Sequence, residues 1–164
     1  MATTRLLSIL VPAYNEEEYL ATSILRALEA PLPEGLTSEV VAVDDGSTDC
    51  TPQILDELAA QYPGRIRVFH HKVNAGKGAA IRTALENAAG EFGIIQDGDL
   101  EYDPSEYPKV LGPLLALMQI RPDLDLIADF AVAGQIARFE ISAGNPPGRL
   151  ELCREIFRHF PTVH

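Results

Sequence analysis

Four short apolar runs, separated by segments with helical periodicity, constrain the fold of this chain most strongly. The runs cover residues 6–11, 39–43, 65–70 and 92–95. The first is almost continuously aliphatic, which is typical of a strand buried on both faces, and such strands belong to parallel sheets covered by helices. Strands that alternate with helices therefore predict an α/β fold built on a mostly parallel sheet.

Helices are predicted between and after these strands. The first begins in residues 16–18, with Asn15 as a plausible N-cap, and is stopped by Pro31. The others cover residues 51–62, about 79–89 and 105–117, with a possible break at Pro113 in the last. Beyond residue 120 the pattern weakens. There, residues 124–132 fit a strand or a buried helix, and residues 149–160 fit a short amphipathic helix.

The composition allows one core-bearing domain and argues against a nucleic-acid partner. The chain has 164 residues, of which 46% are hydrophobic, and a formal net charge of -11. Binding to a nucleic-acid backbone needs clustered Lys and Arg instead. Residues 1–120 carry a net charge of -10 and residues 121–164 only -1. We therefore expect a domain over residues 1–120, with a divergent C-terminal segment packed on it that is not an independent domain.

The cysteines and the apolar stretches favour a cytoplasmic chain. Cys50 and Cys153 are the only cysteines, which suits a reducing compartment, and both are expected to be packing residues. The N-terminus does not fit a signal peptide. The longest apolar stretch, near residues 110–120, is too short to span a bilayer. We expect a soluble chain, with peripheral contact at the cytoplasmic membrane face left open and the oligomeric state unknown.

Polar clusters follow each predicted strand. They occupy residues 12–17, 44–49, 74–78 and 97–101. Because ligands of parallel α/β sheets bind at the carboxyl ends of the strands, we expect the four clusters to converge on one rim.

The fourth cluster is the most acidic. Carboxylates recur at every second position, as Asp97, Asp99, Glu101 and Asp103. Crowded carboxylates are tolerable around a hard divalent cation such as Mg²⁺ or Mn²⁺, which prefers oxygen ligands. The alternative is a solvated acidic turn capped by Asp103.

The second and third clusters suit a nucleotide. Asp44 and Asp45 could accept hydrogen bonds from a nucleobase or a ribose, although turn and capping chemistry is the alternative. Lys77 lies between two glycines at a helix start, where backbone N–H groups and one ammonium suit a diphosphate or local carboxylates. Neither a Walker A loop nor a GxGxxG fingerprint is present, which argues against a P-loop NTPase and a dinucleotide site. His70 and His71 are expected to be surface or packing residues.

Four motifs in order carry a family resemblance. They are VPAYNEE at residues 11–17, VDDGSTD at 43–49, NAGKG at 74–78 and QDGDLEYDP at 96–104. Their order and spacing resemble glycosyltransferase family 2 over about residues 5–115, with the nearest likeness to the dolichyl-phosphate mannose synthase and polyprenyl-phosphate glycosyltransferase group. The resemblance implies a GT-A (Rossmann-like) fold that binds a nucleotide sugar with Mg²⁺ or Mn²⁺.

The resemblance also implies roles for single residues. Asp97 and Asp99 match the two aspartates of the DxD motif, as catalytic residues and metal ligands, and Glu101 matches a further ligand position. The residues expected to bind the nucleotide sugar are Pro12, Tyr14, Asn15, Glu16, Asp44, Asp45, Lys77, Asp97, Gly98 and Asp99. Gly98 is the small residue between the aspartates.

The chain departs from the family after Pro113. The expected strand with a Gly-Ser-Arg-type motif, the acceptor-facing region and the frequent membrane segments are not recognisable in residues 116–164. The leading hypothesis is metal-dependent transfer from a UDP- or GDP-sugar to a polyprenyl or dolichyl phosphate. The alternative is a truncated or divergent chain that retains only nucleotide binding. A nucleotidyltransferase ranks last, because its glycine-rich loop is absent after the first strand.

Overall fold

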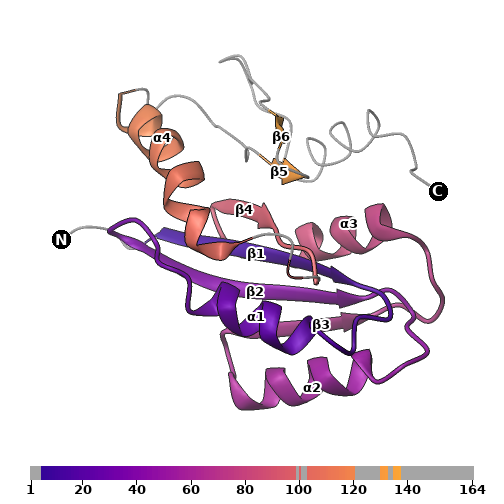
Figure 1. Ribbon diagram of the computed structural model, residues 1–164. Coiled ribbons are helices and arrows are strands. Elements are labelled where there is room, and N and C mark those ends of the chain that lie inside the picture. Colours follow the sequence, from indigo (N-terminus) through magenta and orange to yellow (C-terminus); the bar gives the residue numbers. More distant parts are fainter. Residues whose placement is uncertain (1–4, 99, 101–102, 121–129, 133–134, 138–164) are drawn as a thin grey trace.

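The computed structural model describes residues 5–98, 100, 103–120, 130–132 and 135–137 (Figure 1). Its centre is a sheet of four parallel strands, and the pairing confirms the predicted parallel topology. The strands are β1 (Arg5–Ala13), β2 (Leu36–Asp44), β3 (Ile66–His70) and β4 (Phe92–Ile95), in the order β3-β2-β1-β4.

Helices cover both faces of this sheet. They are α1 (Leu20–Leu28), α2 (Thr51–Gln61), α3 (Lys77–Asn87) and α4 (Tyr107–Ile120), with a 3₁₀ turn, η1 (Pro104–Glu106), before α4. One core cluster joins α1, α2 and the start of α4 to the sheet, and a second joins α3 to the opposite face. In Figure 1, α3 accordingly lies on the other side of the strands from α1 and α2.

The central strand β1 contributes to both cores. Leu7, Ile9 and Val11 belong to the first cluster and Leu10 to the second, and all four are fully buried. Successive side chains of a strand point to opposite faces, so a continuous aliphatic run fits only a strand covered on both sides. The prediction that the first run is such a strand is confirmed.

Two boundaries differ from the predictions. The first helix begins at Leu20 rather than in residues 16–18, and its N-cap position is Tyr19, so Asn15 is not its cap. The third helix begins at Lys77, two residues before the expected start. In addition, α4 is continuous through position 113, where a break seemed possible. An interior proline removes a backbone donor and crowds the carbonyl four residues earlier, but these effects do not end α4, which extends to Ile120.

The part after residue 120 is described only in two short strands. These are β5 (Phe130–Val132) and β6 (Gln135–Ala137), which pair antiparallel in a separate sheet. The predicted strand or helix over residues 124–132 thus ends in a strand, while residues 124–129, the predicted helix over 149–160 and Cys153 lie outside the described residues. No helix in the described part of the chain has the length and hydrophobicity that a membrane crossing requires.

A buried polar network fastens the amino ends of the strands. The carboxylate of Glu39 in β2 accepts hydrogen bonds from Ser8 Oγ (2.6 Å), the amide of Ala89 (2.7 Å) and Arg67 Nη2 (2.8 Å). Burial alone would raise the pKa of Glu39, but these hydrogen bonds outweigh it and hold the pKa below its ordinary value. The charged side chain is therefore part of the fold and lies at the end of the sheet opposite the predicted rim.

Candidate active site

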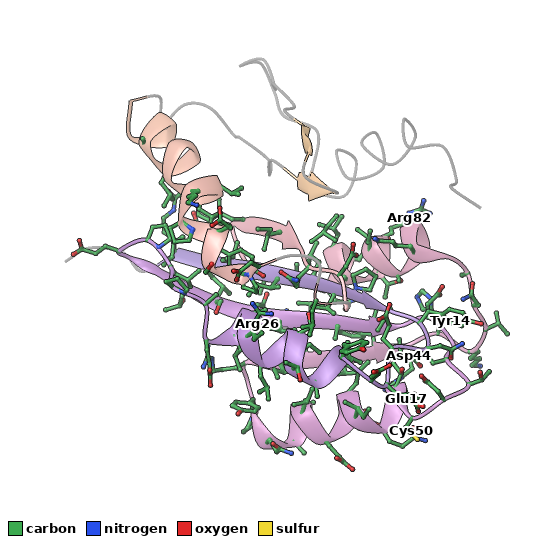
Figure 2. All side chains as sticks on the ribbon, in the orientation of Figure 1. Tyr14, Glu17, Arg26, Asp44, Cys50 and Arg82 are labelled. Carbon is green, nitrogen blue, oxygen red and sulfur yellow. The ribbon has the colours of Figure 1, made fainter. Side chains whose placement is uncertain are left out.

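A pocket lies at the carboxyl ends of the strands. Residues from all four predicted clusters line it, together with Ala80 of α3: Pro12, Ala13, Tyr14, Glu16, Asp45, Asn74, Lys77 and Asp97. Figure 2 shows Tyr14, Asp44 and Glu17 at this end of the sheet. The predicted convergence of the clusters is therefore confirmed for the described residues, whereas Asp99 and Glu101 lie outside them.

Hydrogen bonds join the first and second clusters. Asn15 donates its backbone N–H to Ser47 Oγ (3.0 Å), and its Oδ1 accepts from the amide of Thr48 (2.9 Å). The amide of Glu16 donates to Thr51 Oγ1 (2.8 Å). Asn15 has a φ of +53°, a left-handed conformation that asparagine tolerates better than most residues. Asn15 was expected to bind the nucleotide, but it ties two loops together and does not line the pocket.

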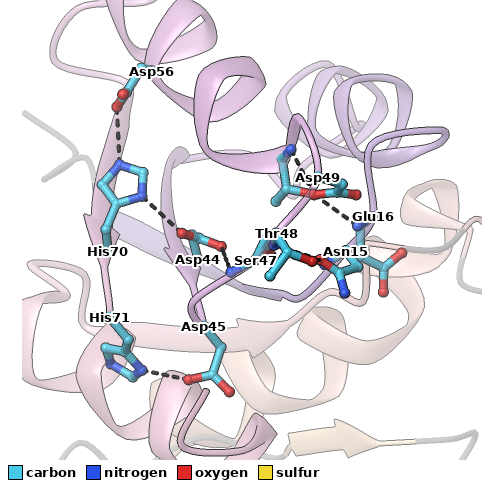
Figure 3. Close-up of polar contacts among 11 residues, drawn as sticks. Asn15, Glu16, Asp44, Asp45, Ser47, Thr48, Asp49, Asp56, His70 and His71 are labelled. Carbon is cyan, nitrogen blue, oxygen red and sulfur yellow. Dashed lines mark hydrogen bonds and ion pairs between the residues drawn. The ribbon is translucent and has the colours of Figure 1, made fainter. Parts of the chain in front are cut away.

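Asp44 is engaged within the protein. Its Oδ1 accepts the amide of Ser47 (2.9 Å) and its Oδ2 contacts His70 Nδ1 (3.2 Å), as Figure 3 shows. The residue is buried and is not among those that line the pocket. These contacts favour the turn alternative for Asp44 over a direct contact with a nucleobase.

Asp45 lines the pocket and also fixes the third cluster. Its carboxylate accepts the amides of Ala75 (3.0 Å) and Gly76 (2.7 Å) and contacts His71 Nδ1 at 2.6 Å. Gly76 is the N-cap residue of α3, so Asp45 sets the position of the first helical residue, Lys77.

His70 is exposed and His71 is partly buried, as expected for surface or packing residues, and both also contact carboxylates beside the rim. His70 bridges Asp44 and Asp56, and His71 bridges Asp45 and Thr83 (2.9 Å). Burial lowers the pKa of His70, but its two carboxylate partners outweigh this and raise it. The contact between His70 and Asp44 was not predictable from either segment alone, because it depends on the pairing of β2 with β3.

Asp97 presents its carboxylate to the pocket. Its Oδ1 lies 2.6 Å from Lys77 Nζ, while its backbone oxygen accepts a hydrogen bond from Ser23 Oγ (3.0 Å). Behind it, Gln96 is buried and accepts the hydroxyl of Tyr107 (2.8 Å), whose pKa is raised by burial. The backbone of Asp97 is thus fixed from the core.

Comparison with known protein families identifies the family to which the chain with this pocket belongs. The family model described as Glycosyl transferase family 2 matches residues 8–120, which hold the sheet and the pocket. The chain belongs to glycosyltransferase family 2. One relative is the undecaprenyl-phosphate 4-deoxy-4-formamido-L-arabinose transferase of Pectobacterium carotovorum, 36% identical over 104 residues. That match covers 63% of this chain and 32% of the relative, so the chain spans about a third of the curated relatives it matches.

Solved structures place this family 2 chain in the GT-A fold. TarS of S. aureus in complex with UDP-GlcNAc superposes with a TM-score of 0.55 at 30% identity, over 82% of this chain and 37% of that one. The mannosyltransferase PcManGT of Pyrobaculum calidifontis, in complex with GDP-Man and Mn²⁺, gives 0.53 at 32% identity, over 63% and 30%. The predicted fold and the likeness to polyprenyl-phosphate sugar transferases are confirmed.

The glycosyltransferase pocket offers oxygen ligands to a divalent cation. Glu16, Asp45 and Asp97 line it, but Asp45 already accepts three hydrogen bonds. The described residues contain no group of three or more His, Cys, Asp or Glu side chains placed to hold a metal ion. The hard carboxylate of Asp97 fits Mg²⁺ or Mn²⁺, and the other two predicted ligands, Asp99 and Glu101, lie outside the described residues.

Gly98 and Asp103 have local roles. A Cβ atom at Gly98 would lie 3.3 Å from both Glu16 Cδ and Leu20 Cδ1, so a larger residue between the aspartates would require these side chains to shift by a few tenths of an ångström. Asp103 accepts the amide of Ser105 (3.0 Å), which lowers its pKa, and pairs with Arg26 (3.2 Å). The capping role proposed for Asp103 is confirmed.

Cys50 does not pack in the interior. It is exposed, and its backbone N–H donates to Glu17 Oε2 (2.9 Å) beside the rim. The expectation that it is a packing residue was wrong, because the helix it precedes buries Thr51 instead.

Proposed function

We propose that this chain binds a UDP- or GDP-sugar with Mg²⁺ or Mn²⁺ and forms the donor side of an enzyme that transfers the sugar to a polyprenyl or dolichyl phosphate. The observation that carries the proposal is the pocket at the carboxyl ends of β1, β2 and β4. It brings a lysine and an anchored aspartate together with residues of the first cluster. The membership of the chain in glycosyltransferase family 2 supports the same donor chemistry.

The proposed roles follow the position of each side chain. Pro12, Tyr14 and Glu16 line the pocket and would contact the nucleotide. Asp97, with Asp99 and Glu101 as expected partners, would hold the cation. When bound, such a cation neutralises the charge that develops on a nucleoside diphosphate as it leaves.

The remaining expected donor residues act on the pocket through their neighbours. Asn15 and Asp44 would support the nucleotide indirectly by holding the loops in place. Gly98 would let the segment after β4 approach Glu16 closely.

A phosphate acceptor suits this pocket better than a sugar hydroxyl. A phosphate is already ionised at neutral pH, so its attack needs no general base. No histidine lines the pocket in the described part of the chain, and His70 and His71 are held by carboxylates beside it. The Pectobacterium relative, an undecaprenyl-phosphate sugar transferase, supports the same acceptor class.

The second candidate is a chain that binds the donor but does not transfer the sugar. It is favoured by the near-neutral charge of residues 121–164, whose net charge is only -1. Residues 116–164 also lack a recognisable basic acceptor motif.

Calorimetric titration tests donor binding. We expect UDP- or GDP-sugars to bind in the presence of Mn²⁺ and much more weakly in chelator. A chain that binds neither nucleotide sugar with Mn²⁺, or binds equally well in chelator, would contradict the proposal. A radiolabelled transfer assay with a short-chain polyprenyl phosphate then separates the two candidates.

A further inference from the structure

Lys77 and Asp97 form the one ion pair between residues that line the described pocket. The Nζ–Oδ1 distance is 2.6 Å, with the Lys77 side chain 52% exposed and that of Asp97 19% exposed. Among the described residues that line the pocket, Lys77 is the only Lys or Arg, and Glu16, Asp45 and Asp97 are the acidic residues. Lys77 therefore supplies the one positively charged side chain among the described residues of the lining.

The two partners are fixed to different degrees. The backbone of Asp97 is held from the core by Ser23 Oγ, and the backbone at the start of α3 is held by Asp45. The Lys77 ammonium, in contrast, sits at the end of a flexible four-carbon stem and is half-exposed. It can therefore leave Asp97 without any movement of the sheet or of α3.

A divalent cation bound to either oxygen of the Asp97 carboxylate would lie close to the Lys77 ammonium, which contacts Oδ1. Mg²⁺ binds carboxylate oxygens at about 2.0–2.1 Å, so a cation on Oδ1 would lie within a few ångströms of the ammonium. Two positive charges at that distance repel, and the repulsion is strong where solvent is partly excluded.

We infer that Lys77 and a divalent cation bind the Asp97 carboxylate in exchange, and that the released ammonium then turns to the phosphates of the nucleotide. The inference rests on the proposed function, because it assumes that Asp97 is a metal ligand. A cation that arrives alone must break the ion pair, whereas a cation that arrives with a nucleoside diphosphate gives the ammonium a new anionic partner. Cation and nucleotide therefore strengthen each other's binding.

The test is a titration of the chain with Mn²⁺ alone, in which the concentration of free Mn²⁺ is measured by electron paramagnetic resonance. We compare the wild-type chain with Lys77→Met, which keeps most of the stem and removes the charge. Exposed ion pairs are worth at most about a fivefold change in an equilibrium constant, so Lys77→Met should bind Mn²⁺ alone about 2- to 5-fold more tightly. At saturating Mn²⁺ the same variant should bind UDP and GDP about tenfold more weakly, because a charge-assisted contact is lost.

Two controls make the result specific. Lys72→Met removes the same formal charge from an exposed lysine outside the pocket lining, and it should leave the Mn²⁺ affinity unchanged. Lys77→Arg retains a positive charge and should not gain Mn²⁺ affinity. If Lys77→Met binds Mn²⁺ no more tightly than Lys72→Met, while the wild type binds nucleotide with Mn²⁺, the exchange is wrong and the proposed function stands. A wild-type chain that binds no nucleotide with Mn²⁺ overturns both.

Discussion

Replacing Gly46 by alanine should destabilise the protein through a steric clash near the site, and the same change at Gly64 serves as the control. Gly46 has a φ of +73°, and a Cβ atom there would lie 2.7 Å from both the amide nitrogen of Asn74 and the carbonyl carbon of Val73. Gly64 has a similar φ of +78° but no atom within 4 Å of its Cβ position. Gly64→Ala therefore measures the cost of the left-handed conformation alone, about 1–2 kcal/mol.

Gly46→Ala adds the steric term. Forcing an extra carbon into a packed region costs about 1–3 kcal/mol. We therefore expect Gly46→Ala to lose about 2–5 kcal/mol in total. For a chain of this size each kcal/mol lowers the Tm by roughly 2–4 °C. The entropy that the unfolded chain loses on a Gly→Ala change is the same at both positions, so it cancels in the comparison.

The assays are urea unfolding and nucleotide titration on both variants. The segment that must move in Gly46→Ala includes Asn74, which lines the pocket, and leads to Lys77, so the folded variant should also bind nucleotide more weakly than Gly64→Ala. If the two variants lose the same free energy of unfolding and bind nucleotide equally well, then the close approach of residue 46 to the third cluster does not shape the pocket.

Three further predictions concern carboxylates. Glu39→Ala should cost about 3–5 kcal/mol in urea unfolding at pH 7, because it removes the charged acceptor from a buried network; a loss below about 1 kcal/mol would contradict this. Since the folded-state pKa of Glu39 lies below its ordinary value of 4.5, the contribution is fully present above that pH, and the difference from wild type should shrink as the pH falls further. Asp45→Asn should lose about 2–4 kcal/mol of unfolding free energy, because the NH₂ group of the new side chain would oppose the backbone N–H of Gly76, the N-cap residue of α3. Asp56→Asn is the control: the Asp56 side chain is 69% exposed, so this change should lose at most about 1 kcal/mol. Equal losses would refute the role given to Asp45. Asp99→Asn should weaken Mn²⁺-dependent nucleotide binding more than Asp103→Asn, whose side chain caps a turn, and calorimetry showing equal effects would remove the metal site.

The sheet could be predicted because its signal is local. Each strand is a short apolar run whose burial on both faces leaves few alternatives, and the structure retains all four. The start of α1 could not be predicted in the same way. The amides of Asn15, Glu16 and Glu17 donate to side chains of residues 47–51, more than 30 positions away, so tertiary hydrogen bonds replace the local cap.

The position of the rim was predictable from the topology, but which of its residues face the pocket and which are bound within the protein was not. Parallel strands bring their carboxyl ends to one edge, whichever residues stand there. Whether Asp44 faces a ligand or the protein depends on the register between β2 and β3, which puts His70 beside it. That register comes from long-range pairing and is not written in either segment alone.

The number of protein partners on each carboxylate distinguishes the aspartates that are held by the protein from the one that we propose to bind a cation. Both oxygens of Asp44 are engaged, and the carboxylate of Asp45 accepts two backbone N–H groups and contacts a histidine. Asp49 likewise accepts the amides of Glu17 and Thr51. A carboxylate has about four acceptor positions, and those filled by fixed backbone groups cannot be vacated without local unfolding. Within the described residues, the carboxylate of Asp97 contacts only the ammonium of a half-exposed lysine, the most readily displaced partner on the rim. We therefore propose Asp97 as the cation ligand. Its backbone is fixed by a hydrogen bond from Ser23, and its carboxylate has fewer contacts with described residues than those of Asp44, Asp45 and Asp49.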